Sequence, residues 1–104
     1  MCGRYTLRAK LNSILAELNA AMRPEYNYVP RYNIAPTQDV LAVRQGAESG
    51  GRELVPLRWG LIPSWAKDEK IAYSTINARA ETVADKPAFR SAFKKRRCLI
   101  VADG

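Results

Sequence analysis

The chain has 104 residues, 47% of them apolar, and its 17 Lys and Arg outnumber 10 Asp and Glu to give a net charge of +7. This composition indicates one small globular domain with no membrane-spanning segment, and the excess of cations favours either a polyanionic partner or a merely basic surface. With no histidine and only two cysteines, a zinc site and a disulfide framework are excluded, so we expect no metal and no cofactor.

The first third of the chain combines extended, helical and irregular patterns. Residues 2–7 predict a short strand or extended arm. Apolar residues at helical spacing then predict a helix over residues 8–22, with Thr6 as its N-cap and Pro24 beyond its end. Residues 23–38 are rich in Pro, Tyr and Asn, which predicts an irregular loop of the kind that builds binding pockets.

The middle of the chain predicts a β-hairpin. Residues 39–44 and 52–59 each have the composition of a strand, and the Gly-containing stretch 46–51 between them indicates the turn. Pro63 keeps the following loop, residues 60–69, out of regular structure.

The end of the chain predicts a short helix over residues 87–96, with a proline at its first turn, and then a strand. The apolar run 98–102 is typical of a strand buried on both faces, and Asp103-Gly104 is a hairpin-turn signal that no partner strand follows. We therefore expect residues 1–104 to be the N-terminal part of a single domain, unless the strand 98–102 pairs between two earlier strands. The predicted class is α+β: a curved, mainly antiparallel sheet with flanking helices, incomplete in this chain.

Cys2 has the most distinctive chemistry of any residue in the chain. Aminopeptidases remove Met1 when a small residue follows it, which would leave Cys2 with a free α-amine beside its thiol. The amine can condense with an aldehyde, and the thiolate can close onto the imine to form a thiazolidine ring, with the advantage of an intramolecular step. The same residue could instead be the nucleophile of amide hydrolysis, or have no chemical role.

The densest basic block is the run of four cations from Lys94 to Arg97. Such a run can bind nucleic acid. It is also typical of the solvated C-terminal end of a helix, where cations complement the helix dipole. We favour the solvated helix end.

Five short stretches stand out by their composition and their order along the chain. They are Met1-Cys-Gly-Arg-Tyr5, Arg31-Tyr-Asn-Ile-Ala-Pro36, Trp59-Gly-Leu-Ile-Pro-Ser-Trp65, Ile76-Asn-Ala-Arg-Ala-Glu-Thr82 and Arg97-Cys-Leu-Ile-Val-Ala-Asp-Gly104. Together they resemble the SOS response-associated peptidase (SRAP) family, the abasic-site shielding proteins. The resemblance implies that residues 1–104 are the N-terminal part of one SRAP domain. It also implies a protein that senses abasic sites in single-stranded DNA and crosslinks to them through Cys2 as a thiazolidine.

The resemblance assigns roles to two residues of the site. Cys2 is the nucleophile, and Asn77 contacts the abasic sugar and positions the crosslink. An amide supplies both a donor and an acceptor, as orienting a sugar oxygen requires. Arg79 lies two residues further on, on the same face of an extended segment, where it would hold a phosphate.

Other candidate site residues follow from their positions. Arg4 stands two residues after Cys2, so we expect it to share the nucleophile's face of the arm and to hold a phosphate. Trp65 is a candidate stacking platform for an exposed base, or alternatively a loop aromatic that fills the core. Asn33 and Pro36 are expected to line the pocket floor without touching DNA. Packing in the interior is expected of Tyr5, Tyr32, Trp59 and Cys98.

The chain departs from the family pattern in one respect. The family's catalytic Glu, just after the Asp-Gly turn, and its downstream His have no counterpart in these 104 residues. We therefore expect impaired crosslinking, or dependence on the missing half. The family name keeps lyase and peptidase (hydrolase) activities open, and a non-catalytic single-stranded nucleic-acid binding module is a third alternative. We expect a cytoplasmic monomer, associated with the nucleoid during DNA damage and not with a membrane.

Overall fold

Strands β4 (Asp39–Gln45) and β5 (Arg52–Arg58) form the antiparallel hairpin on which the fold is built. Both strands agree with the prediction, and the backbone N–H of Gly46 donates to the carbonyl of Gly51 at 2.7 Å where the strands end. The structure is a computed structural model that describes residues 2–22, 27–46 and 51–104. Most of the predicted turn therefore lies outside the described residues.

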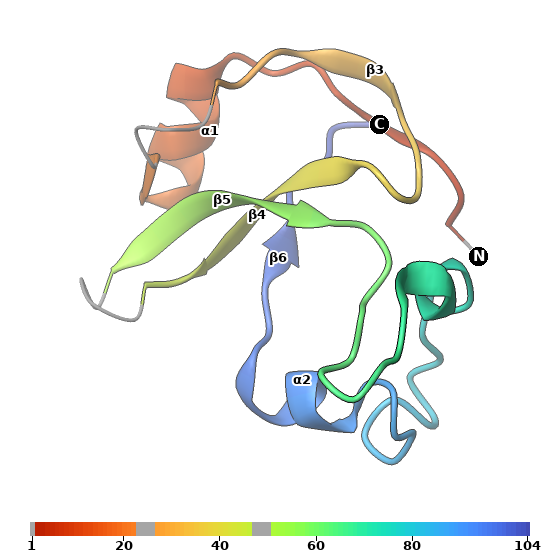
Figure 1. Ribbon diagram of the computed structural model, residues 1–104. Helices are drawn as coiled ribbons and strands as arrows, with labels where there is room; N and C mark the ends of the chain where they lie inside the picture. The colour runs from red at the N-terminus through yellow and green to blue at the C-terminus, as the bar shows by residue number, and fades with distance from the viewer. Residues whose placement is uncertain (1, 23–26, 47–50) are drawn as a thin grey trace.

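Two further strands complete a four-stranded sheet of order β2-β5-β4-β6. β2 (Ala20–Met22) runs parallel to β5, whereas β6 (Leu99–Ile100) runs antiparallel to β4. A separate antiparallel pair joins β1 (Tyr5–Leu7) to β3 (Arg31–Ile34), and β3 crosses above the sheet in Figure 1. The predicted α+β class with a mainly antiparallel sheet is confirmed, with one parallel pair of strands.

Helix α1 (Leu11–Leu18) is shorter than the helix predicted over residues 8–22. Asn19 adopts the left-handed conformation that ends a helix, with φ at 48°, and Asn tolerates this conformation better than most residues. Arg52 donates to the carbonyl of Leu18 at 2.9 Å, which satisfies one acceptor left open at the helix end. The chain then pairs with β5 as β2, so strand pairing overrides the helical spacing of the apolar residues.

Two other predictions near α1 are wrong because Thr6 and residues 31–34 belong to the paired strands β1 and β3. Lys10, and not Thr6, precedes the first turn of the helix, and no side chain caps it. Strand β3 lies inside residues 23–38, where the sequence predicts irregular backbone, because β1 provides a partner for its hydrogen bonds. Pro24, the predicted end of the helix, lies outside the described residues.

The two faces of the hairpin are covered by different parts of the chain, because alternate residues of a strand point to opposite faces. On one face, Val43 and Leu54 pair across the strands and share a buried cluster with Ile14 of α1. Each of these side chains is at most 5% exposed, and burying one stabilises the fold by about 1.5–3 kcal/mol. The opposite face, which carries Val40 and Arg44, borders a cavity.

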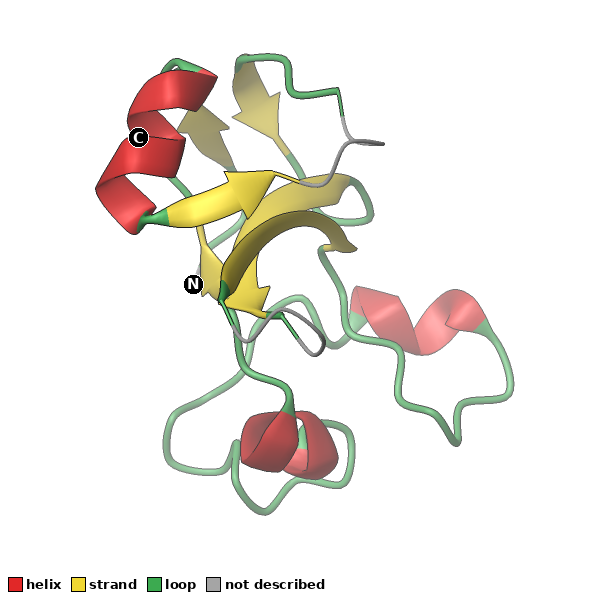
Figure 2. Cartoon of the chain, turned by 90° about the vertical axis from the view of Figure 1, so that its left-hand side faces the viewer, coloured by secondary structure: helices red, strands yellow, loops and turns green. Residues whose placement is uncertain are grey.

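The segment between β5 and β6 runs beneath the sheet, on the side away from α1 (Figures 1 and 2). Gly60 turns the chain into this segment: its φ is 121°, and a Cβ there would lie 2.9 Å from the carbonyl oxygen of Ala72. The segment contains the 3-10 helix η1 (Glu69–Tyr73) and helix α2 (Arg90–Lys95). Pro87 lies in the turns before α2, so the predicted helix over 87–96 begins later than expected.

Strand β6 corrects the prediction of a doubly buried strand at residues 98–102. It lies at the edge of the sheet, and its residues Leu99 and Ile100 are 67% and 51% exposed because no other described element covers them. The strand covered on both faces is β4, in which Val40 through Val43 are at most 4% exposed. The exposure of the two strands differs because β4 lies between β5 and β6, whereas β6 has a neighbouring strand on one side only.

Asp103 joins the C-terminal end of the chain to the N-terminal arm. Its carboxylate accepts hydrogen bonds from the backbone N–H groups of Arg8 and Ala9, at 2.7 and 2.8 Å, and from the hydroxyl of Thr6 at 3.0 Å. Backbone hydrogen bonds run from the N–H of Asp103 to the carbonyl of Thr6 and from the N–H of Thr6 to the carbonyl of Gly104. In the described part of the chain, Asp103-Gly104 therefore bridges to β1 where a hairpin turn is predicted (Figure 1).

These contacts hold the pKa of the Asp103 carboxyl below its ordinary value. The N–H of Arg8 contributes most, and the N–H of Ala9, the hydroxyl of Thr6 and the charge of Arg8 act in the same direction, whereas desolvation opposes them. A carboxyl whose pKa falls on folding stabilises the fold above its unfolded pKa, which is about 3.9 for Asp. That stabilisation is lost as the pH falls through the lower pKa of the folded state.

We expect Asp103→Asn to lower the urea midpoint of unfolding at neutral pH, because an amide lacks the charge that these donors stabilise. The difference from the unsubstituted protein should narrow below about pH 4, where the Asp103 carboxylate of the unfolded chain starts to be protonated. Urea unfolding followed by circular dichroism at several pH values measures this difference. Asp85→Asn is the matched control, since the Asp85 side chain is exposed and has no partner among the described residues. A difference that stays constant with pH would contradict the prediction.

Candidate active site

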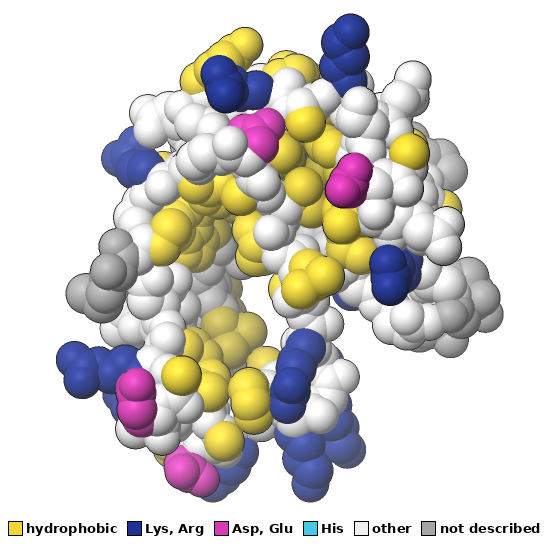
Figure 3. Space-filling view, turned by 180° about the vertical axis from the view of Figure 1, so that it is seen from behind, with side chains coloured by type: hydrophobic (Ala, Val, Ile, Leu, Met, Phe, Trp, Pro, Cys, Tyr) yellow, Lys and Arg dark blue, Asp and Glu magenta, His cyan; other side chains and the backbone are white. Residues whose placement is uncertain are grey.

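A cavity of about 1060 Å³ lies between the sheet and the segment beneath it. One face of strands β5, β4 and β6 forms its floor, and residues 60–62, residues 76–77 and the C-terminal part of α2 with the residues after it form its other walls. Figure 3 shows the surface hollowed between these two parts of the molecule, with apolar side chains on the walls of the hollow.

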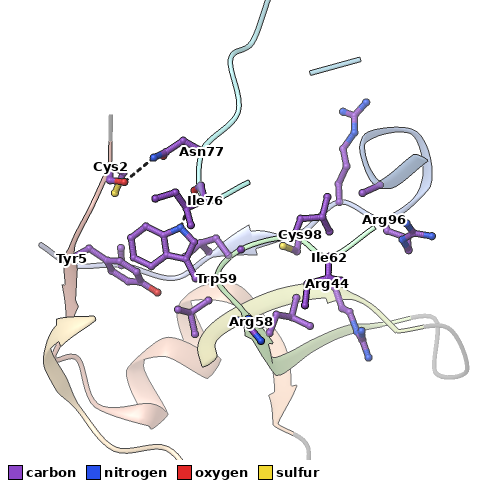
Figure 4. Close-up of a pocket in the computed structure, with 18 of the residues that line it drawn as sticks. Cys2, Tyr5, Arg44, Arg58, Trp59, Ile62, Ile76, Asn77, Arg96 and Cys98 are labelled. Carbon is purple, nitrogen blue, oxygen red and sulfur yellow. Dashed lines mark hydrogen bonds between the residues drawn. The ribbon is translucent and has the colours of Figure 1, made fainter. Parts of the chain in front are cut away.

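Cys2 and Asn77 meet at one end of this cavity (Figure 4). The Nδ2 of Asn77 donates to the backbone carbonyl of Cys2 at 3.0 Å, although 75 positions separate the two residues. Cys2 is exposed and Asn77 is half-buried, and the Cys2 thiol lies 4.0 Å from the carbonyl oxygen of Arg4. The structure thus brings together the residues expected to act as nucleophile and positioning amide.

Trp59 connects this pair to the core. Its Nε1 donates to the carbonyl of Ile76 at 2.8 Å, and Ile76 directly precedes Asn77. Its ring packs against Tyr5 with the ring centroids 5.6 Å apart, and Tyr5 begins the strand that follows the Cys2 arm. The packing role expected of Trp59 and Tyr5 agrees with their contacts to the core, but both also line the cavity.

Arg4 and Asn33 contact each other at the surface. The Nη1 of Arg4 donates to the Oδ1 of Asn33 at 3.0 Å, and both residues are exposed. Neither Asn33 nor Pro36 lines the cavity that Cys2 and Asn77 border. The expectation that they form its floor is wrong for this cavity, because β3 pairs with β1 and so lies beside the N-terminal arm.

Trp65 and Arg79 are exposed and do not line the cavity. Trp65 is 59% exposed, which rules out the alternative that it fills the core. The side chain of Arg79 has no partner among the described residues. Both side chains are therefore accessible to a ligand that extends beyond the cavity.

Several residues that line the cavity have no role predicted from the sequence at this site. Cys98, assigned to packing, is exposed as a residue, but its thiol borders the cavity, where desolvation raises its pKa and nearby Arg44 partly opposes this. Tyr32, also assigned to packing, is 71% exposed. The period-two pattern of strands was the available signal, because Cys98, Ile100 and Ala102 share one face and all line the cavity.

The reactive groups at this end of the cavity are the thiol and backbone of Cys2 and the amide of Asn77. Within residues 2–22, 27–46 and 51–104, no three His, Cys, Asp or Glu side chains cluster as metal ligands would. No helix in the described part of the chain is long and apolar enough to cross a membrane.

Known proteins share the sequence and the fold of this chain. A family profile described as SOS response associated peptidase (SRAP) matches residues 1–104. The abasic site processing protein YoqW of Bacillus subtilis is 48% identical over 104 residues, which are 99% of this chain and 46% of that protein. The abasic site processing protein HMCES of Rattus norvegicus is 36% identical over 124 residues, which cover 100% of this chain and 35% of that protein. A crystal structure of a protein from Bordetella bronchiseptica has a TM-score of 0.72 and 30% identity, covering 98% of this chain and 48% of that one.

The fold and the site define an α+β protein in which Cys2 is held beside Asn77 at the edge of a cavity. The chain belongs to the SRAP family, as the five sequence stretches predict. It spans about half the length of YoqW, 46% by the matched residues.

We expect Trp59→Phe to destabilise the fold by about 1–3 kcal/mol, because the half-buried carbonyl of Ile76 loses its donor. Trp65→Phe is the matched control and should change stability by no more than about 0.5 kcal/mol, since Trp65 is an exposed residue. Urea unfolding followed by circular dichroism measures both effects. Equal effects of the two substitutions would show that the hydrogen bond from Trp59 does not contribute.

Proposed function

We propose that the chain captures abasic sites in single-stranded DNA as a covalent thiazolidine crosslink on Cys2, after Met1 has been removed. The observation that carries this proposal is the 3.0 Å hydrogen bond from Asn77 to Cys2 at the edge of the cavity. It holds an exposed terminal thiol beside an amide that can contact a sugar. The names of YoqW and HMCES, both abasic site processing proteins, support the choice of substrate.

The reaction needs only the two nucleophiles of Cys2 and the aldehyde of the ring-opened abasic sugar. The neutral α-amine adds to the aldehyde carbon, and loss of one water gives an imine. The thiolate then adds to the imine carbon, a C–S bond forms, and the nitrogen takes up the proton that the thiol released. Neither step is an oxidation or a reduction. Because both nucleophiles belong to one residue, the ring closes in an intramolecular step.

Asn77 acts as a positioning residue in this mechanism. One N–H of its amide holds the carbonyl of Cys2, which limits the directions that the terminal amine and thiol can take. An amide has a second N–H and an acceptor oxygen, and these can bind a hydroxyl of the ring-opened sugar. The arm and the sugar would then be held by the same side chain.

The DNA strand is expected to contact residues outside the cavity as well. Arg4 has guanidinium donors beyond the one given to Asn33, and Arg79 is unpaired among the described residues, so both can hold phosphates. Exposed Trp65 can stack on a base, which contributes about 1–3 kcal/mol per base in single-strand binding. We propose that the protein acts in the cytoplasm, at the nucleoid, as a monomer that uses no cofactor or metal.

A peptidase function for Cys2 is less well supported than the crosslink. A cysteine that attacks an amide usually needs a paired base, most often histidine, and the chain has no histidine. Condensation with an aldehyde requires only a neutral amine, and an α-amine is neutral more often at pH 7 than a lysine side chain. Crosslinking to an aldehyde therefore requires fewer catalytic groups at the site than amide hydrolysis does.

Intact mass spectrometry after incubation with a single-stranded oligonucleotide bearing one abasic site tests the proposal. The expected product is a chain that lacks Met1 and carries the oligonucleotide less one water. Cys2→Ala should abolish the adduct, and Cys2→Ser should leave an imine that survives only after reduction with borohydride. Asn77→Ala should slow adduct formation by about 10- to 100-fold, the scale of one hydrogen bond of about 1.4–2.7 kcal/mol.

A folded chain that begins with Cys2 and gives no adduct would refute the proposal for this chain. If Cys2→Ala leaves binding of the oligonucleotide unchanged and the unsubstituted chain forms no adduct, the chain is a non-catalytic single-strand binding module. If instead the unsubstituted chain cleaves a peptide and Cys2→Ala does not, the chain is a thiol peptidase.

A further inference from the structure

A group of cations lines the cavity at a distance from Cys2. Lys95, Arg96 and Arg97 follow one another at the end of α2 and its exit, and Arg44 projects from β4 on the cavity side. We call these four residues the cationic wall. Three of the four belong to the basic run 94–97, for which the sequence favours a purely solvated helix end.

The cationic wall and the Cys2–Asn77 pair occupy opposite ends of one cavity. In Figure 4, Arg44 and Arg96 lie on one side of the drawn residues and Cys2 and Asn77 on the other, with Trp59 and Arg58 between them. Arg58 is an ion-pair partner of Glu69, at 3.3 Å. The effect of Arg44 on the pKa of Cys98 agrees with this placement, because Cys98 also lines the cavity. A ligand bound at Cys2 can therefore reach the cationic wall only by extending along the cavity.

The charges of the cationic wall are only partly compensated. Arg44 forms an ion pair with Glu53, its Nε lying 2.8 Å from the carboxylate. Arg97 donates through its Nε to the carbonyl of Phe93 at 2.6 Å and lies over the Phe93 ring at 4.0 Å. The side chains of Lys95 and Arg96 have no partner among the described residues. Among the described residues, Lys95 and Arg96 are therefore the two cations of the wall whose side chains are free to bind a ligand.

The contacts of Arg97 also argue against a purely solvated helix end. A cation at the C-terminus of a helix is stabilised by the open carbonyl groups there. Arg97 already fills that role at the carbonyl of Phe93. Lys95 and Arg96 are not needed for it, and both line the cavity.

We propose that Lys95 and Arg96 bind phosphate groups of the nucleotides flanking the abasic site, so that the single strand runs along the cavity from Cys2 to the cationic wall. The cavity has the chemistry that this ligand requires, with apolar walls for a base and cations at the far end for phosphates. The inference rests on the proposed function for its substrate. It adds a phosphate site separate from Arg4 and Arg79, neither of which lines the cavity.

The salt dependence of binding tests this phosphate site directly. All proteins carry Cys2→Ala, so that no crosslink can form, and the probe is a fluorescent single-stranded oligonucleotide without an abasic site. The dissociation constant is measured by fluorescence anisotropy at several salt concentrations. Lys95→Ala with Arg96→Ala should reduce the salt slope by about 1.4, because each phosphate of a single strand that a cation neutralises contributes about 0.7 to the slope.

A matched control removes the same two charges elsewhere. Lys10→Ala with Arg52→Ala also replaces one lysine and one arginine, and these residues lie near the two ends of α1 and do not line the cavity. The control should leave the salt slope nearly unchanged. Lys95→Arg with Arg96→Lys keeps both charges and should also keep the slope, which separates loss of charge from damage to the fold.

The outcomes separate this inference from the proposed function. If the chain with Cys2 intact forms the adduct but Lys95→Ala with Arg96→Ala changes the slope no more than the control, the phosphate site is refuted and the crosslink stands. If no adduct forms but the slope falls selectively, the phosphate site is supported and the crosslink fails. A loss of binding that Lys95→Arg with Arg96→Lys reproduces would also refute the phosphate site, because the charges would not be its cause.

Discussion

The contact between Asp103 and the N-terminal arm is the constraint on which the geometry of the site depends. One carboxylate accepts three hydrogen bonds from residues 6–9, and two backbone hydrogen bonds join the same segments. These bonds hold the arm next to the end of β6. Because β6 pairs with β4, the arm is fixed relative to the sheet that forms the cavity floor. Cys2 lies only three residues before β1, so it has little freedom to leave the cavity edge.

Trp59 makes the second connection that the site requires. Its ring contacts Tyr5 on the arm side, and its indole N–H holds the carbonyl of Ile76 on the other side. The indole therefore sets the separation between the Cys2 arm and the segment that carries Asn77. The hydrogen bond from Asn77 to Cys2 then joins two segments that are already close. A preorganised pair of this kind loses less entropy when a substrate binds.

The two faces of the sheet have different surroundings: one packs against α1 and the other borders the cavity. The face toward α1 carries closely packed aliphatic side chains, among them Val43 and Leu54. The other face of the hairpin carries Val40, Arg44 and Leu57, which line the cavity. Since strand residues alternate between faces, one hairpin supplies both the core and the cavity floor. A substitution on the cavity face can therefore alter charge without opening a void in the core.

The sequence alone determined the elements whose signals are local and the family to which the chain belongs. Strand-like composition on either side of a Gly-containing stretch specified the β4–β5 hairpin, and short motifs specified Cys2, Asn77 and the family. The tertiary structure decided the features that depend on contacts between distant segments. Pairing with β5 turned the end of the predicted helix into β2, and an edge position left β6 exposed. The meeting of Cys2 with Asn77, and of Lys95 and Arg96 with the same cavity, depends on which face each strand presents and how the chain closes over 75 residues. No local pattern carries that information, because periodicity shows that a residue faces one side but not what lies opposite.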